Sequence, residues 1–457
     1  MMIRRLGFAG NLEDLPQLAD AFQAAGLCPR EAQRKAVLAV DCVGSLPRRP
    51  IQQLFYVPGR IEVLGKHTDY AGGDSLVFAV EQGFCIAVAP RSDRHVRLCA
   101  ASTGETIGCD LDADFVPTQG HWANYPMTVA RRVARNFPDA TRGAEVAFAS
   151  DLPPAAGMSS SSALVIGVFL AIAEVNRLWE SSAWKDNLQN VLDLASYLAT
   201  VENGQSFRAL KGDRGVGTFG GSEDHTAILT SQPGHILWYA YQPVRFRRAI
   251  PIPDGLIFCV AASGVSAEKT GKALEKYNAA SRLASQLTQL WQQAIGKAEG
   301  SLAEILASDP DAKIRLARIV AELHFSPQEQ ESLRRRLEHF AKENCEILPQ
   351  AVDALEKGDL SEFGRWVDLS QQAAEELLGN QIPETSFLAK SARECGAIAA
   401  SAFGAGFGGA VWALVPGERA GEFLARWAER YRAAFPHSSE AARFFSTHAG
   451  PATFGLL

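Results

Sequence analysis

The sequence has no long apolar run, no paired cysteine motif and no excess of positive charge. Its longest apolar stretch, residues 163–174, includes a glycine and is shorter than the roughly 20 residues that a membrane-spanning helix needs. None of the eight cysteines follows the C-x-x-C spacing of common structural zinc motifs. With 45 Lys and Arg against 51 Asp and Glu, the chain has no general attraction for nucleic acid or for an anionic membrane.

These absences favour a cytoplasmic protein with reduced thiols and with neither nucleic acid nor membrane as a partner. The charged residues 1–5 are not followed by an apolar core, so no signal peptide is expected. Hydrophobic residues make up 47% of the 457 residues, which is ordinary for a globular protein, and the length favours two to three domains. The sequence does not indicate an oligomeric state.

The apolar periodicity divides the chain into an N-terminal extension and two larger units. Residues 1–50 mix short helical patterns with Pro and Arg, and we expect them to pack on the main body. Strand or helix patterns follow at residues 55–64, 84–90, 95–100, 144–149, 160–179 and 186–202. After Pro251-Ile252-Pro253 they restart at residues 256–262, 266–296, 302–378 and 410–415. We therefore predict an α+β chain with domains at residues 51–245 and 246–457.

The segment at residues 153–163, P-P-A-A-G-M-S-S-S-S-A, follows a predicted strand and opens an apolar helix. A helix start presents unpaired N–H groups and a partial positive charge, and small residues let a phosphate approach closely. The serine hydroxyls add donors for phosphate oxygens or ligands for Mg²⁺. No Lys follows the glycine, so this is not the G-x-x-x-x-G-K-[ST] loop. The alternative is a serine-rich helix cap without a ligand.

A second polar segment lies at residues 58–73, P-G-R-I-E-V-L-G-K-H-T-D-Y-A-G-G. The predicted strand ends at Leu64, and Gly65 allows a sharp turn into a cluster of Lys, His, Thr, Asp and Tyr. An Asp accepts hydrogen bonds from neighbouring hydroxyls, and His and Lys donate them, so the cluster suits a hydroxyl-rich ligand. The alternative is a solvated hairpin loop.

Two further segments are weaker signals. Residues 403–410, F-G-A-G-F-G-G-A, form a glycine-dense turn that runs into a strand, and the lack of a following helix argues against a dinucleotide site. Residues 220–227, G-G-S-E-D-H-T-A, place acids between glycines and an apolar stretch. A carboxylate there is a candidate general base, or merely the cap of a helix.

Together and in this order, the four segments resemble those of the GHMP small-molecule kinases and, within them, the galactokinase family. The segment at 58–73 carries the most specific match, and the matches span residues 57–415. The resemblance implies an N-terminal α/β domain, a C-terminal ferredoxin-like α+β domain and an active site between them. It implies ATP-dependent phosphorylation of the anomeric (C1) hydroxyl of a monosaccharide, with Mg²⁺.

The resemblance also implies roles for individual residues. Asp224 would face the anomeric hydroxyl with Arg60 beside it, and Glu202 and Ser160 would bind Mg²⁺. The residues expected at ATP are Pro154, Gly157, Met158, Ser159, Ser160, Ser161, Ser162 and Gly406. The residues expected at the sugar are Lys66, His67, Asp69, Gly221 and Gly408. The sequence leaves open whether Asp224 acts as a base or only electrostatically, and whether Glu223 replaces it.

Three positions depart from the family pattern. The family usually has Glu where this chain has Lys66, at the C6 end of the sugar, so we weigh an anionic sugar such as a hexuronic acid against pairing of Lys66 with a protein acid. The base motif reads G-S-E-D-H rather than G-I-M-D-Q. Ala155 stands where many members have Gly, which a negative φ would tolerate. The sequence is also compatible with a kinase for a heptose, fucose or amino sugar, and with a non-catalytic sugar sensor.

Overall fold

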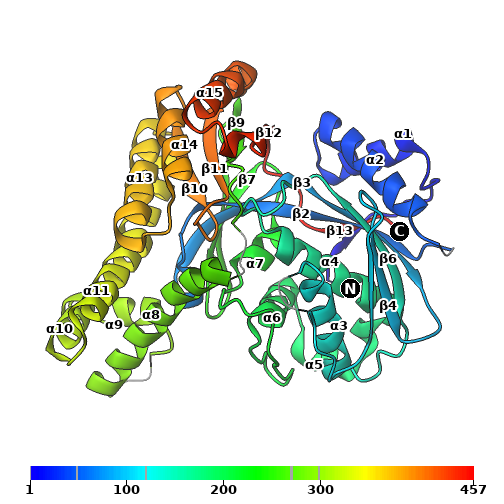
Figure 1. Cartoon of the computed structure of the whole chain (residues 1–457), viewed down its shortest axis with the longest axis horizontal. Helices are drawn as coiled ribbons and strands as arrows, with labels where there is room; N and C mark the ends of the chain where they lie inside the picture. The colour runs from blue at the N-terminus through cyan, green and yellow to red at the C-terminus, as the bar shows by residue number, and fades with distance from the viewer. Residues whose placement is uncertain (1, 48–49, 119–120, 268–270, 297–298) are drawn as a thin grey trace.

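The computed structural model describes residues 2–47, 50–118, 121–267, 271–296 and 299–457. Within these residues, nine strands form one mixed sheet (Figure 1). Its main path runs in the order β1 (Arg4–Arg5), β13 (Phe454–Gly455), β2 (Gln53–Leu64), β3 (Asp74–Pro90), β6 (Ala144–Ser150), β4 (His95–Ala100) and β5 (Thr106–Asp110). The first part of β3 also pairs with β7 (His235–Ala240), which pairs with β8 (Arg245–Pro251).

Helices cover both faces of this sheet because alternate residues of its strands point to opposite sides. Tyr56 and Cys85 face a small core under α1 (Leu15–Ala25) and α2 (Pro29–Gly44), which are formed by the predicted N-terminal extension. Phe55 and Ile86 face the larger core on the other side. The helices on that side are α3 (Asn124–Asn136), α4 (Ser160–Asn176), α5 (Ser182–Asn187), α6 (Val191–Asn203) and α7 (Glu223–Thr230).

Helix α4 lies at the centre of the larger core. Its sequence is apolar on every side, and fourteen consecutive residues, 162–175, are buried. A helix that is hydrophobic all round belongs inside the protein, and each fully buried large apolar side chain contributes about 1.5–3 kcal/mol. The N-terminus of α4 is therefore held rigidly at the end of the serine-rich segment.

The second sheet is antiparallel and follows the order β10-β11-β9-β12. Its strands are β9 (Leu256–Ala262), β10 (Ala399–Phe403), β11 (Ala410–Pro416) and β12 (Arg443–Thr447). Helices α14 (Pro383–Glu394) and α15 (Ala420–Ala434) pack against it. This spatial order is that of a ferredoxin-like β-α-β-β-α-β unit, as predicted.

A long helical stretch separates β9 from β10 and projects to one side of the molecule (Figure 1). It contains α8 (Gly271–Ile295), α9 (Leu302–Ser308), α10 (Ala312–Glu322), α11 (Pro327–Ala341), α12 (Leu348–Glu356) and α13 (Leu360–Ala373). A π-helical segment, Lys342–Ile347, joins α11 to α12. The predicted helix at 266–296 corresponds to α8, although residues 268–270 lie outside the described residues.

Two strands beyond the expected domain boundary belong to the first sheet. Strand β8 begins at Arg245 and pairs with β7, and β13 returns near the end of the chain to pair with β1 and β2. The bounds 51–245 and 246–457 remain a prediction, and the strand pairing shows that the chain passes between the two sheets more than once. None of the helices in the described part of the chain is both long and apolar enough to cross a membrane.

Candidate active site

Arg60 connects three of the sequence motifs. It lies on β2, is 4% exposed, and donates from Nη1 to the carbonyl of Gly157 in the serine-rich segment at 2.8 Å. Its Nε and Nη2 donate to Oδ1 of Asp224 at 2.8 and 2.6 Å. The other carboxylate oxygen of Asp224, Oδ2, accepts a hydrogen bond from Ser162 at 3.3 Å. The structure therefore brings the predicted base and its Arg to the start of α4.

Glu223, the rival base, lies beside this pair in a different environment. It is buried, and its Oε1 is 3.6 Å from Nε of Arg60. Burial and the neighbouring Glu62 raise the pKa of Glu223 well above its usual value. Burial would lower the pKa of Arg60, but the charges of Asp224 and Glu223 outweigh it and raise the pKa. Arg60 therefore stays a cation between the two acids, and of these Glu223 is the one whose ionised form its surroundings disfavour.

The predicted sugar residues Asp69, His67 and Gly221 line the same cavity as Asp224. Oδ2 of Asp69 accepts the backbone N–H of Glu223 at 3.2 Å, which ties the turn after β2 to the start of α7. The ring nitrogens of His67 contact the Tyr70 hydroxyl at 2.7 Å and the Ala405 carbonyl at 3.2 Å. A Cβ on Gly221 would lie 2.4 Å from Oδ2 of Asp69, so only glycine fits there.

The serine-rich segment has the form of an anion-binding helix start. Gly157 and Ser159 have positive φ values of 72° and 59°, and the Ser159 side chain does not cap α4. The first N–H groups of α4 are thus left without that cap, as an anion-binding helix start requires. Ser160 and Ser161 are half-buried, Met158 and Ser162 are buried, and Pro154 is exposed.

The backbone of Ala155 differs from the expected conformation with a negative φ. Its φ is +49°, in the left-handed region that favours glycine, rather than negative. The carbonyl of Ala155 accepts the N–H of Ala267 at 2.8 Å, a contact that holds the residue in this conformation. The substitution for the family glycine therefore carries local backbone strain.

The residues expected to hold Mg²⁺ fit a hard cation. Glu202, near the end of α6, is a buried carboxylate whose Oε1 lies 3.2 Å from Nε2 of His225. Oγ of Ser159 is buried and has no hydrogen-bond partner among the described residues. A carboxylate together with a hydroxyl is the kind of oxygen ligand set that Mg²⁺ binds alongside phosphates. Ser160, which the sequence singled out, is half-buried at the same helix start.

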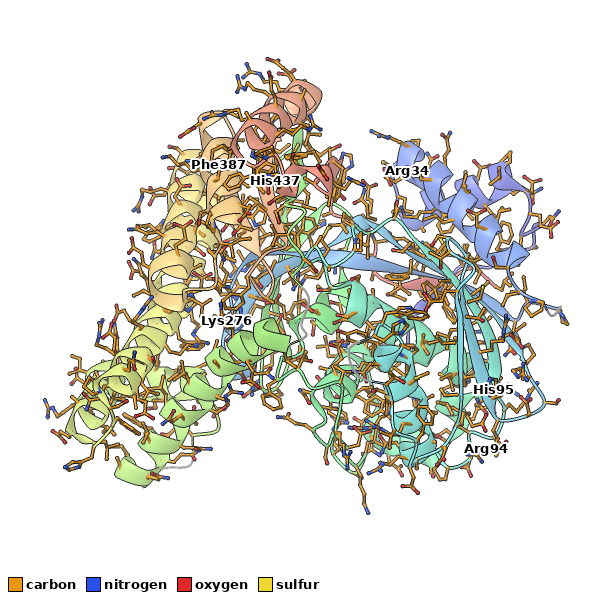
Figure 2. The ribbon with its side chains drawn as sticks, in the orientation of Figure 1. Arg34, Arg94, His95, Lys276, Phe387 and His437 are labelled. Carbon is orange, nitrogen blue, oxygen red and sulfur yellow. The ribbon has the colours of Figure 1, made fainter. Side chains whose placement is uncertain are left out.

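The glycine-dense turn packs directly on the serine-rich segment. A Cβ on Gly404 would lie 2.7 Å from the Gly157 carbonyl, and Gly404 has a φ of +76°. Lys276 of α8 lies over the Phe407 ring, with 5.4 Å between Nζ and the ring centre (Figure 2). A Cβ on Gly406 would meet the Asn380 carbonyl, and one on Gly408 would lie 2.8 Å from the Val265 carbonyl, so both positions need glycine, and their contacts with a ligand stay a prediction.

The structure does not bring Lys66 to the cavity. Its side chain is 1% exposed, and Nζ donates to Oγ of Ser370 at 2.8 Å. Ser370 in turn donates to Oε1 of Glu343, which also accepts the backbone N–H groups of Gly65 and Lys66. Lys66 therefore joins the sugar motif to the helical stretch, which favours a partner within the protein over an anionic sugar, the two alternatives weighed from the sequence.

A polar cavity lies where these motifs meet. It is lined by Arg60, Glu62, His67, Asp69, Tyr70, Ser162, Ala199, Glu202, Thr218, Gly220, Gly221, Glu223, Asp224, His225, Tyr277, Gly404 and Ala405. A second cavity of about 790 Å³ adjoins it at Gly220 and Gly221. The two cavities share Asp69 and Tyr70 as well.

Sequence reasoning missed Glu62 and Tyr277 in this lining. Glu62 is two residues from Arg60 on β2, so the period of the strand already placed both on one face. Burial raises the pKa of Glu62 to about 7, although Arg60, Lys66 and a hydrogen bond from Glu223 lower it. Tyr277 belongs to α8, far along the chain, and no local pattern points to it.

Comparison with known proteins identifies the class. Residues 124–208 match the GHMP kinases N terminal domain, residues 351–433 match GHMP kinases C terminal, and residues 47–90 match the galactokinase galactose-binding signature. The fold is similar to that of a Lactococcus lactis galactokinase crystallised with galactose, with a TM-score of 0.72, 21% identity and coverage of 88% of this chain and 94% of that one. It is also similar to a Streptococcus pneumoniae phosphomevalonate kinase, with a TM-score of 0.53, 14% identity and coverage of 86% and 99%. The fold and the site together define a GHMP kinase.

Curated relatives narrow the class to one family. A galactokinase of Chloroflexus aggregans is 30% identical over 380 residues, covering 82% of this chain and 87% of that protein. A galactokinase of Roseiflexus is 28% identical over 361 residues, covering 78% and 82%. The chain belongs to the galactokinase family and is an ATP-dependent sugar kinase.

Proposed function

We propose that the chain transfers the γ-phosphoryl group of ATP to the C1 hydroxyl of galactose, with Asp224 as the base and Arg60 as its partner. The observation that carries the proposal is the pairing of Arg60 with Asp224 directly beside the start of α4. The galactose-binding signature at residues 47–90 and the relatives named galactokinase support the choice of sugar.

The geometry suits one oxygen of Asp224 for proton transfer. Arg60 donates twice to Oδ1, whereas Oδ2 receives a longer bond from Ser162. In the proposed step the C1 oxygen forms a bond to the γ-phosphorus, the bond from that phosphorus to the β–γ bridging oxygen breaks, and ADP leaves. The hydroxyl proton passes to Oδ2 of Asp224. Because Arg60 stabilises the ionised carboxylate, Asp224 is a weak base and the proton moves late.

We further propose that Mg²⁺ binds together with ATP at this site. Glu202 and the hydroxyls of Ser159 and Ser160 are the groups that would hold it. When bound, it would neutralise charge on the phosphates as the phosphoryl group is transferred. The N–H groups at the start of α4 and the Gly157 turn would fix the phosphates in place.

A hexuronic acid kinase and a non-catalytic sensor receive less support. Lys66 is hydrogen-bonded to Ser370 and does not line the cavity, so its ammonium is not placed to pair with the carboxylate of a hexuronic acid. Retention of Arg60, Asp224 and Glu202 in one cavity argues against a non-catalytic sensor, because a sensor does not need them. We further propose that the enzyme works in the cytoplasm, since all eight cysteines are free thiols.

An ADP-release assay on a panel of sugars tests the proposal. We expect turnover with galactose in the presence of Mg²⁺ and none with galacturonate. In Asp224→Asn, kcat should fall by about 10²–10⁴-fold, the usual contribution of a general base, while galactose still raises the melting temperature. Glu223→Gln is the matched control.

Three results would count against the proposal. If Glu223→Gln abolished turnover and Asp224→Asn did not, the roles of the two acids would be exchanged. Preference for galacturonate would overturn the choice of sugar. Stabilisation by galactose without any turnover would favour the sensor.

A further inference from the structure

Cys28, Glu81 and His448 form a cluster outside the active site. Cys28 precedes α2, Glu81 lies on β3, and His448 follows β12, so three distant parts of the chain meet there. One ligand atom from each lies within 4.8 Å of the other two. Among the described residues, this is the one group of three or more His, Cys, Asp and Glu side chains with that spacing.

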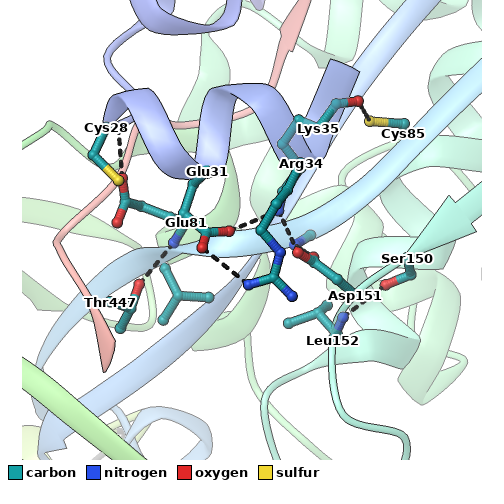
Figure 3. A network of polar contacts seen from close by, with 12 residues as sticks. Cys28, Glu31, Arg34, Lys35, Glu81, Cys85, Ser150, Asp151, Leu152 and Thr447 are labelled. Atoms are coloured by element: carbon teal, nitrogen blue, oxygen red, sulfur yellow. Dashed lines mark hydrogen bonds and ion pairs between the residues drawn. The ribbon is translucent and has the colours of Figure 1, made fainter. Parts of the chain in front are cut away.

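The carboxylate of Glu81 is fixed at the centre of this cluster. It is 2% exposed, Oε1 accepts the N–H of Cys28 at 2.7 Å, and Oε2 accepts the N–H of His448 at 3.0 Å. Nδ1 of His448 is also 3.0 Å from Oε2. Figure 3 shows Cys28 next to Glu81 at the start of α2, with Thr447 bonded to the backbone of Glu81. The backbone contacts hold the carboxylate in place whether or not a ligand is present.

We propose that Cys28, Glu81 and His448 bind a Zn²⁺ ion. Sulfur, imidazole nitrogen and carboxylate oxygen are the three ligand types of zinc, and its bond lengths of about 2.0–2.3 Å place tetrahedral ligands about 3.3–3.7 Å apart. In the structure, Nδ1 of His448 is 3.0 Å from Oε2 of Glu81, and the ligand atoms of all three residues lie within 4.8 Å of one another. Small side-chain rotations bring these distances to the tetrahedral value. The side chain of His448 is 53% exposed, so the ion can enter and a water can complete four ligands.

The charges balance when the ion binds. The Cys28 thiol loses its proton to solvent and binds as a thiolate, and His448 binds through Nδ1 as a neutral imidazole with its proton on Nε2. Thiolate and carboxylate together neutralise the two positive charges of the ion. The zinc then joins α2, β3 and the segment after β12, which stabilises the folded chain because the unfolded chain does not form the site.

Cobalt(II) provides a direct probe of the site. We expect one equivalent of Co²⁺ to bind the full chain after chelator treatment and to give a near-ultraviolet thiolate-to-cobalt charge-transfer band, which Zn²⁺ abolishes. Cys28→Ser should remove the band, and His448→Asn should weaken Zn²⁺ binding by at least about tenfold. The controls are Cys345→Ser, at an exposed cysteine, and His437→Asn, at an exposed histidine between α15 and β12 (Figure 2).

Zinc should also raise the melting temperature of the wild type and of both controls, but not that of Cys28→Ser. Absence of a stoichiometric cobalt band, or a band that persists in Cys28→Ser, would overturn the proposal. His448→Asn changes an exposed side chain, so it separates loss of metal binding from loss of folding. None of these readouts depends on sugar phosphorylation, so they stand apart from the proposed function.

Discussion

Replacement of Lys35 by Met tests how α2 is held on the first sheet. Lys35 is completely buried on α2, and Nζ donates to Oδ2 of Asp151 at 2.5 Å and to Oε2 of Glu31 at 3.3 Å (Figure 3). Oδ1 of Asp151 accepts the N–H of Gly83 from β3 at 2.9 Å. Asp151 also lies just before the serine-rich segment.

The variant leaves two buried carboxylates facing each other without their shared cation. Removing one partner of a buried ion pair costs about 3–5 kcal/mol, because the remaining charge stays desolvated. At about 2–4 °C per kcal/mol for a unit of this size, Lys35→Met should melt about 6–20 °C below the wild type. Adding Asp151→Asn should recover much of the loss, since the amide oxygen still accepts from Gly83 and Glu31 keeps its contact with Arg34 at 3.1 Å.

Thermal unfolding followed by circular dichroism measures both effects. Lys313→Met is the matched control, because Lys313 pairs with Glu338 on the surface, with side chains 43% and 39% exposed. Exposed pairs contribute about 0–1 kcal/mol, so this control should shift the melting temperature only slightly. Equal shifts for Lys35→Met and Lys313→Met would refute the reasoning, and so would a double variant no more stable than Lys35→Met.

Two further predictions concern the sugar side of the cavity. The unfolded chain ionises Glu62 near pH 4.5, whereas the folded chain keeps the proton to about pH 7, so stability falls as pH rises through that window by about 1.4 kcal/mol per unit. Glu62→Gln should remove this slope. In urea titrations, the unfolding free energy of the variant relative to that of the wild type should rise by up to about 3 kcal/mol between pH 4.5 and 8. Parallel curves of unfolding free energy against pH for the two proteins would contradict this. Gly221→Ala should displace Asp69 and raise the KM for sugar about tenfold to a hundredfold, with the KM for ATP little changed. Gly44→Ala is the control, because a Cβ at Gly44 would have no atom within 4 Å. An unchanged sugar KM in Gly221→Ala would show that Asp69 does not contact the sugar.

Local patterns were enough to predict six of the thirteen strands in the described part of the chain and to single out the four motifs that line the cavity. Strand β9 has the predicted bounds, and the four motifs meet around Arg60, because each carries its own apolar strand or glycine turn. Strand β3 begins at Asp74, ten residues before the predicted start, since polar Glu81 and Gln82 interrupt the apolar pattern. Glu81 finds its hydrogen-bond partners in Cys28 and His448, which are distant in sequence, and Gln82 is buried.

Long-range contacts account for what the sequence could not show. The direction of Lys66 depends on Ser370 and Glu343, which lie 304 and 277 residues further along the chain. The positive φ of Ala155 accompanies a hydrogen bond from Ala267, across the two sheets. Strand β13 is only two residues long, and its pairing with β2 leaves no periodic signal. Each of these depends on tertiary partners rather than on neighbouring residues.

The shape of the guanidinium explains why the site needs Arg60 rather than any cation. Its three nitrogens serve two partners: Nε and Nη2 donate to Asp224, and Nη1 donates to the Gly157 carbonyl. These partners lie 164 and 97 residues away in sequence, and the rigid plane of the side chain sets their separation. A Lys has one ammonium on a flexible chain and could not fix both at once. In the proposed reaction, the same group that would supply positive charge near the transferred phosphoryl also sets the distance between Asp224 and the Gly157 turn.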